Sequence, residues 1–144
     1  MMASRLEDER AIERLIRRYV HLVDAGRWEE VASLFVEDGE LVRPSAPDRP
    51  IAGREAILAA FRARPARLAR HLVCNTVIGF DGPDVANATS YSVLVSAVPQ
   101  RGISLSVGAF DDVLVREGGI WLFRSRRGST AIDEAVVQHL LALT

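Results

Sequence analysis

Apolar residues recur every three or four positions near the start of the chain, a period that predicts an amphipathic helix. The buried stripe of this helix consists of Ile12, Leu15, Ile16, Tyr19, Val20 and Val23. Ser4 and Glu7 have the spacing of a capping box, so we expect the helix to begin near Leu6. Gly26 follows the last periodic residue and is expected to end the helix.

Asp24 occupies the position where the next apolar residue of this helix would fall, four residues after Val20. Its carboxylate also lies in the last helical turn, where the helix dipole disfavours negative charge. A residue that breaks two local rules at once is a candidate for function. The alternative is that Asp24 caps the next short helix or bonds the turn at Gly26, because aspartate is a common capping residue.

The region after the first helix is predicted to be built from short elements. Helices are expected at 28–35 and 53–62, a turn at 37–39, a strand at 40–42 and an irregular, proline-containing loop at 44–50. Arginines then cluster around Pro65, at Arg62, Arg64, Arg67 and Arg70. We interpret this cluster as a solvated basic loop rather than an anion site, because its spacing fits no phosphate-binding loop.

The second half of the chain predicts a sheet. Strands separated by turn signals are expected at 70–78, 85–98, 103–116 and 120–127. Thr130 and Asp133 are candidate caps of a C-terminal helix with an apolar stripe, which could cover a pocket mouth, pack on the sheet or meet a second subunit. The order of elements predicts one α+β domain over residues 1–144. In it, helices lie on the concave face of a curved antiparallel sheet and leave a blind cavity.

The first of these strands contains the most distinctive polar residues. The two-residue period of a strand places on one face His71, Val73, Asn75 and Val77. Both faces of this strand hold apolar residues, so we expect it to be buried on both sides, with His71 and Asn75 pointing into an interior space. In the next strand, Tyr91 belongs to the face formed by the odd-numbered residues.

The composition excludes several classes of function. A net charge of −1 gives no sign of a nucleic-acid partner, and no run approaches the ~20 apolar residues of a membrane span. Every basic residue is an arginine, which rules out lysine Schiff bases and phosphate-loop lysines. The single cysteine, Cys74, fits a reducing cytoplasm. His21, His71 and His139 lack metal-ligand spacing and no dinucleotide fingerprint is present, so we expect no metal and no nucleotide cofactor.

The segments that carry a family resemblance are residues 15–28, 34–39, 53–57, 71–75 and 119–121. They resemble SnoaL-like, polyketide-cyclase-like domains of the nuclear transport factor two-like superfamily, in its scytalone dehydratase-like branch. The resemblance implies a cone-shaped α+β barrel, a deep pocket for a small molecule and a homodimer. It also implies a His–Asp pair, because Asp24 and His71 match the positions of that pair in the dehydratase and dehydrochlorinase relatives.

Other site positions follow from the same resemblance. Tyr91 stands where the dehydratases have a second histidine, and Arg126 is the counterpart of an arginine on the last strand of the dehydrochlorinases. Gly108 and Phe110 replace a serine and an asparagine of the dehydratases.

These residues predict a cofactor-independent lyase or isomerase, dehydratase-like or cyclase-like, acting on a small, largely apolar substrate. His71 would act as general base, with Asp24 fixing its tautomer. Tyr91 would polarise a carbonyl or protonate a leaving group, and Tyr19 would do so less directly, because it is about 140° from Asp24 around the helix. Asn75 and Arg126 would bind substrate. The alternative is a non-catalytic domain of the same kind that binds a small ligand or serves as an accessory subunit.

Overall fold

The computed structural model describes residues 2–143, with side chains from Arg5 onward. Its helices are α1 (Met2–Asp24), α2 (Trp28–Ser33), α3 (Arg54–Arg62) and α4 (Glu134–Leu141). Its strands are β1 (Phe35–Val42), β2 (Ile51–Ala52), β3 (Ala69–Phe80), β4 (Val85–Val98), β5 (Gly102–Glu117) and β6 (Ile120–Ile132). The α+β architecture expected from the sequence is confirmed.

The strands form one six-stranded sheet in the order β2-β1-β6-β5-β4-β3. Every neighbouring pair is antiparallel except β1 and β6, which run parallel. The sheet is therefore mixed, and it is not closed into a barrel. The parallel pair arises because β1 comes from the first half of the chain and adds to the edge of the β3–β6 meander. Helix α3 and the four strands β2 to β5 lie between the two partners in sequence.

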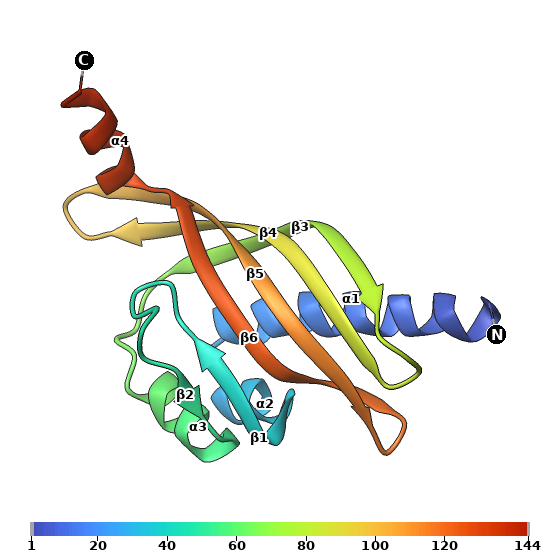
Figure 1. Ribbon diagram of the computed structural model, residues 1–144. Helices are drawn as coiled ribbons and strands as arrows, with labels where there is room; N and C mark the ends of the chain where they lie inside the picture. The colour runs from blue at the N-terminus through green and yellow to red at the C-terminus, as the bar shows by residue number, and fades with distance from the viewer. Residues whose placement is uncertain (1, 144) are drawn as a thin grey trace.

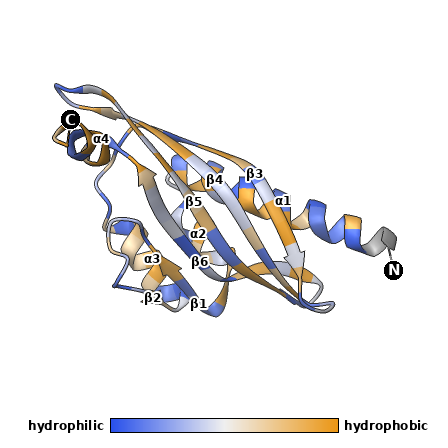
Figure 2. Cartoon of the chain, turned by 45° about the horizontal axis from the view of Figure 1, so that its top comes forward, coloured by the Kyte–Doolittle hydropathy of each residue, from blue (hydrophilic) through white to orange (hydrophobic). Residues whose placement is uncertain are grey.

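Helices α1, α2 and α3 lie against one face of this sheet (Figure 1). The apolar stripe predicted for α1 is buried, and it packs with residues of α3 and the strands in a single hydrophobic core. Helix α4 lies apart, beyond the end of β6, and none of its described residues is buried. Figure 2 colours α4 as largely hydrophobic, so its apolar stripe is exposed.

Some predicted boundaries differ from the structure. Helix α1 extends back to Met2, so Ser4 lies within the helix and its side chain lies outside the described residues. Helix α2 ends at Ser33, and β1 already begins at Phe35, so the predicted turn at 37–39 is an irregular stretch inside a strand. Asp133 does cap α4, where its side chain accepts from the backbone N–H of Val136.

The described helices include none that is both long and apolar enough to cross a membrane.

Candidate active site

Asp24 and His71 come from two elements that meet at the edge of the sheet. Asp24 is the last residue of α1, and His71 is the third residue of β3. The Asp24 Oδ1 and His71 Nδ1 atoms are 2.6 Å apart. The backbone N–H of His71 donates to Asp24 Oδ2 over 2.9 Å. This N–H is available because β3 is an edge strand with β4 as its one neighbour, so the carboxylate also fastens the strand edge to the helix.

This geometry fixes the orientation of the imidazole. A carboxylate oxygen accepts hydrogen bonds, so Nδ1 of His71 carries a hydrogen, and in the neutral form of the ring the other nitrogen, Nε2, has a free lone pair. Both side chains are largely shielded from solvent, with 13% of His71 and 11% of Asp24 exposed. The two hydrogen bonds offset the unfavourable position of Asp24 at the negative end of the helix dipole.

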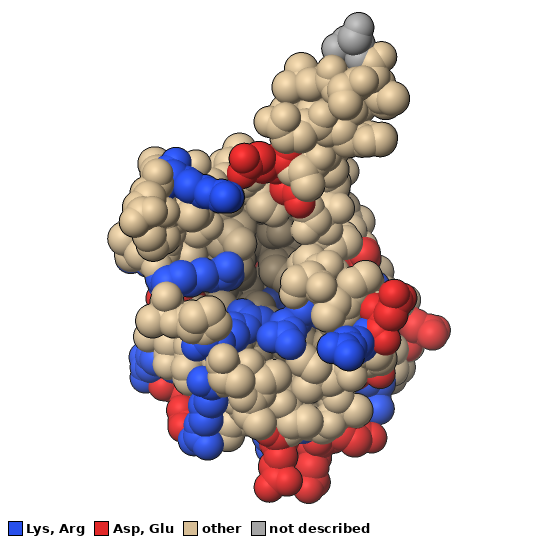
Figure 3. Space-filling view, turned by 90° about the vertical axis from the view of Figure 1, so that its left-hand side faces the viewer, with Lys and Arg blue, Asp and Glu red and all other residues tan. Residues whose placement is uncertain are grey.

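His71 lines a pocket of about 520 Å³ on the helix-covered face of the sheet. In the space-filling view the molecule is hollowed at this place (Figure 3). Apolar side chains of the wall include Val23, Leu41, Leu94 and Phe110. Hydroxyl groups of Ser45, Ser92, Ser106, Ser129 and Thr130 are interspersed among them. The pocket therefore offers an apolar interior with several polar groups, the usual composition of a small-molecule site.

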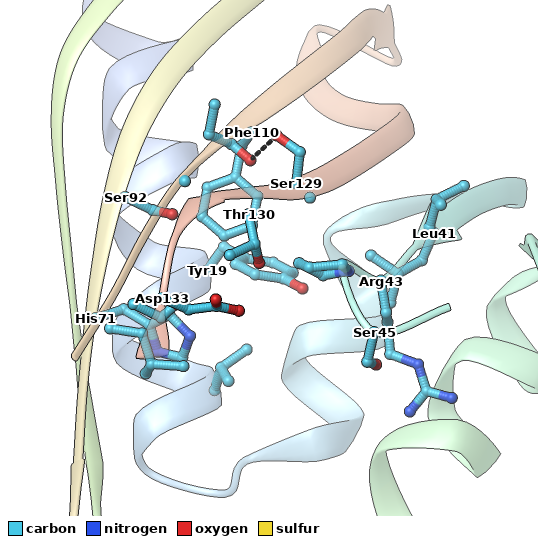
Figure 4. Close-up of a pocket in the computed structure, with 18 of the residues that line it drawn as sticks. Tyr19, Leu41, Arg43, Ser45, His71, Ser92, Phe110, Ser129, Thr130 and Asp133 are labelled. Carbon is cyan, nitrogen blue, oxygen red and sulfur yellow. Dashed lines mark hydrogen bonds between the residues drawn. The ribbon is translucent and has the colours of Figure 1, made fainter. Parts of the chain in front are cut away.

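Tyr19 also lines the pocket, although the helical wheel places it well away from Asp24. Its ring contacts four phenylalanines edge-on, with centroids 5.8–6.4 Å away, namely Phe35, Phe61, Phe110 and Phe123. Burial raises the pKa of the Tyr19 phenol, which opposes its ionisation. Figure 4 shows Tyr19 between His71 on one side of the pocket and Arg43 on the other. The phenol is thus a fixed, neutral hydrogen-bond donor in the pocket wall.

Two glycines shape the wall made by β5 and β6. A Cβ at Gly108 would lie 1.8 Å from the carbonyl oxygen of Ser129, and one at Gly128 would lie 2.9 Å from the ring of Pro44. Glycine at position 108 therefore permits a close approach of the two strands where their register shifts. Side chains at these positions would either displace the backbone or fill the pocket.

Arg126 lies behind the pocket wall rather than in it. Its side chain is fully buried and donates to both carboxylate oxygens of Asp112, over 2.9 and 3.2 Å. The guanidinium lies 4.2 Å from the ring centroid of Tyr19 and 3.9 Å from that of Phe110. The expectation that Arg126 binds substrate is corrected accordingly: this arginine supports the pocket-lining rings from the sheet side.

Tyr91 and Asn75 are not brought to the pocket. Tyr91 points to the outer face of β4 and is 54% exposed, while its neighbour Ser92 lines the pocket. Asn75 is exposed and has a positive φ of 53°, within a bulge where the register of β3 shifts between Cys74 and Val77. The extra residue reverses the facing of the strand beyond it, so the predicted alternation from His71 does not extend to Asn75.

Three arginines that the sequence analysis did not assign to the site line the pocket: Arg43, Arg64 and Arg67. The interpretation of the cluster around Pro65 as a solvated loop is therefore wrong for Arg64, which is half-buried, whereas Arg67 lines the pocket but is exposed to solvent. Asp133 lines the pocket as well and is labelled among its lining residues in Figure 4. Apart from the local clustering of arginines, no sequence signal marks these residues, because each comes from a loop or an element end whose path depends on the whole fold.

Among the described residues, no group of three or more His, Cys, Asp or Glu side chains is arranged to hold a metal ion.

Comparison with known proteins assigns the chain to a family. The sequence profile of the SnoaL-like domain matches residues 4–127. No curated protein matches significantly.

Two solved structures from Novosphingobium aromaticivorans are similar. One is a proposed scytalone dehydratase, 29% identical over 92% of this chain and 90% of that one, with a TM-score of 0.84. The other is an NTF2-like protein with a cystatin-like fold, 28% identical over 97% and 94%, with a TM-score of 0.80.

A type 2 hexachlorocyclohexane dehydrochlorinase shares the fold at 18% identity, with 92% of this chain and 91% of that one covered and a TM-score of 0.81. The homodimer implied by the resemblance stays a prediction. The profile match over most of the chain and the similarity of fold and sequence show that the protein belongs to the SnoaL-like domain family.

Proposed function

We propose that this protein is a cofactor-independent lyase or isomerase in which His71 removes a proton from a carbon atom of a small substrate. The observation that carries the proposal is the 2.6 Å contact between Asp24 and His71 at the wall of a pocket of about 520 Å³. A histidine held on one nitrogen and open on the other is equipped for proton transfer. The proposed dehydratase activity of a relative supports a reaction of this type.

In the proposed reaction, the substrate C–H bond breaks and its proton moves to Nε2 of His71. The carbon electron pair then either expels a leaving group on the neighbouring carbon or moves onto an adjacent carbonyl oxygen. The resulting imidazolium donates through Nδ1 to Asp24, whose negative charge stabilises it, as the aspartate does in serine-protease triads. In an isomerisation, the imidazolium returns the proton at a second carbon.

Tyr19 replaces Tyr91 as the proposed acid. Its phenol faces the same pocket as His71 and keeps its proton because burial raises its pKa. A neutral phenol can donate a hydrogen bond to the carbonyl or leaving group as negative charge develops there. The edge-on phenylalanines around its ring hold the group in place without competing for its hydrogen bond.

Deuterium exchange tests the proposal without knowledge of the natural substrate. Small carbon acids, such as 2-tetralone and related aryl ketones, are incubated with the protein in D2O, and loss of the α-proton signal is followed by NMR. Exchange is expected to be faster with the protein than without it. His71→Ala should reduce the catalysed rate by about 10²-fold or more, the usual contribution of a general base. His21→Ala, at an exposed position on α1, is the matched control and should retain the rate.

Two further variants test the assigned roles. Asp24→Asn should slow exchange because it disturbs the tautomer of His71, and Tyr19→Phe should slow it while Tyr91→Phe does not. A pocket that binds the panel with no His71-dependent exchange for any compound would contradict the enzymatic proposal. That result would favour the alternative, a non-catalytic small-ligand-binding domain.

A further inference from the structure

The pocket has a positive rim although the whole chain carries a net charge of −1. Arg43 follows β1, whereas Arg64 and Arg67 follow α3, so two separate segments bring these guanidinium groups to one cavity. Figure 3 shows arginine side chains gathered beside the hollow. One carboxylate, Asp133, also lines the pocket, and it is already engaged as the cap of α4.

The arginines of the pocket differ from other shielded arginines in their partners. Among the described side chains, half-buried Arg116 pairs with aspartates, and half-buried Arg54 donates to a backbone carbonyl. Half-buried Arg43 and Arg64 have no hydrogen bond or ion pair from their side chains to any described residue, and Nε of Arg43 is buried without an acceptor. Nη1 of Arg126 is also buried without an acceptor, but Nε and Nη2 of that arginine pair with Asp112. Shielded guanidinium groups normally have acceptors, so an acceptor from outside the chain is the simplest completion.

The electrostatics of Arg64 agree with this deficit. Burial lowers the pKa of the Arg64 guanidinium, and the nearby positive charges of Arg43 and Arg67 lower it further. An anion placed among these groups would offset both the desolvation and the repulsion. The three arginines therefore form a site that is more favourable with an anion bound than without one.

We propose that the pocket takes a small organic anion, whose carboxylate or enolate oxygens bind Arg43 and Arg64. The inference rests on the proposed function for the orientation of the rest of the molecule. Figure 4 places His71 and Arg43 on opposite sides of the pocket, with Tyr19 between them. An anion held at the arginines would extend its carbon skeleton along the apolar wall, with an acidic C–H directed toward His71.

This arrangement also suits the chemistry. When His71 accepts a proton from the carbon next to a carboxyl or keto group, the electron pair of the C–H bond moves onto the carbonyl oxygen. Negative charge therefore grows at the end of the substrate that faces the arginines. Preorganised guanidinium groups stabilise such charge more effectively than water does. Arg67, which is exposed, would attract the anion toward the pocket mouth.

Binding measured by isothermal titration calorimetry tests the inference. The probes are the anions 2-naphthoate, phenylacetate and benzoate, each compared with its neutral primary amide. We expect at least one carboxylate to bind about tenfold or more tightly than its amide. Arg43→Gln and Arg64→Gln should each lower the affinity for the carboxylate about tenfold, since a charge-assisted hydrogen bond contributes at least this factor. The affinity for the amide should stay unchanged.

Arg14→Gln is the matched control, because it removes the same charge from an exposed position on α1 that does not line the pocket. An equal loss of affinity in Arg14→Gln, or no arginine-dependent carboxylate binding across the panel, overturns the inference.

The two proposals fail separately. In one outcome, carboxylate binding depends on Arg43 and Arg64 and persists in His71→Ala, but no exchange depends on His71. This result would support the anion site and contradict the catalytic proposal. In the other outcome, exchange of neutral ketones depends on His71 but is unchanged by either arginine substitution, and carboxylates bind no more tightly than their amides. This result would support the catalytic proposal and contradict the anion site.

Discussion

The two sides of Tyr19 carry arginines in opposite situations. On the sheet side, Arg126 is fully buried, lies 4.2 Å from the ring centroid and pairs through two hydrogen bonds with Asp112. On the pocket side, Arg43 and Arg64 have no acidic partner among the described residues. The same residue type is thus found in two environments around one ring, and these environments predict two different purposes.

The difference separates structure from function within a small domain. A guanidinium that is already paired supports the fold, so disrupting its pairing should lower the free energy of unfolding. A guanidinium that is shielded and unpaired adds little to the fold, so its removal should change the affinity for a ligand more than the free energy of unfolding. The following variants test this distinction, beginning with the largest expected change in the free energy of unfolding.

The largest effect is expected for Asp112→Asn. The substitution keeps the shape of the side chain but leaves the buried Arg126 guanidinium without a counter-charge, which should cost about 3–5 kcal/mol. Urea unfolding followed by tryptophan fluorescence measures the change. Asp111→Asn is the matched control, because Asp111 is exposed and accepts from the Thr89 hydroxyl, and it should change stability by less than about 0.5 kcal/mol. A loss below about 1 kcal/mol in Asp112→Asn would show that the pair does not support the fold.

A smaller effect is expected for Asp8→Asn at the far end of the sheet. Asp8 Oδ1 accepts from Trp121 Nε1 over 2.9 Å and from Arg116 Nη1 over 2.8 Å. The Arg116 side chain is 26% exposed, so solvent weakens the ion pair and the cost should be about 1–2 kcal/mol. Asp84→Asn removes the other partner of the same arginine, at a carboxylate that is 61% exposed, and should cost less than about 0.5 kcal/mol. Equal losses in the two variants would contradict the dependence on burial.

The architecture and the unusual position of Asp24 could be anticipated because each leaves a local mark in the sequence, whereas the pairing of Asp24 with His71 was implied by the family resemblance. The strands of the sheet follow alternating runs between turn signals, and Asp24 interrupts an apolar stripe at a helix end. In the structure, Asp24 Oδ1 and His71 Nδ1 are 2.6 Å apart. The catalytic role of the pair is still a prediction.

The remaining site residues could not be anticipated for reasons specific to each. For Tyr91, both faces of β4 hold apolar residues. The alternation therefore places the odd-numbered residues on one face without showing whether that face points into the core or to solvent. For Asn75, one extra residue in a bulge exchanges the faces to which odd- and even-numbered side chains of β3 point, and no sequence motif marks that bulge. For Arg64, the path of the loop after α3 depends on contacts made by the entire fold. Local periodicity therefore predicts elements better than it predicts which side chains meet.

The smallest effect is expected for Arg43→Met and Arg64→Met, and it is the sharpest test of the comparison. Methionine keeps much of the aliphatic stem and removes a guanidinium that has no hydrogen-bond or ion-pair partner among the described residues. The substitution therefore removes the cost of burying that charge and, for Arg64, the repulsion from Arg43 and Arg67. For Arg64 this gain is partly offset by the loss of its cation–π contact, in which Cζ lies 4.1 Å from the ring centroid of Phe61. We expect the free energy of unfolding to change by less than about 0.5 kcal/mol or to rise slightly, measured by the same urea titrations. A loss of about 2 kcal/mol or more in either variant would make these arginines structural, as Arg126 is, and would remove the reason to regard the pocket side of Tyr19 as reserved for a ligand.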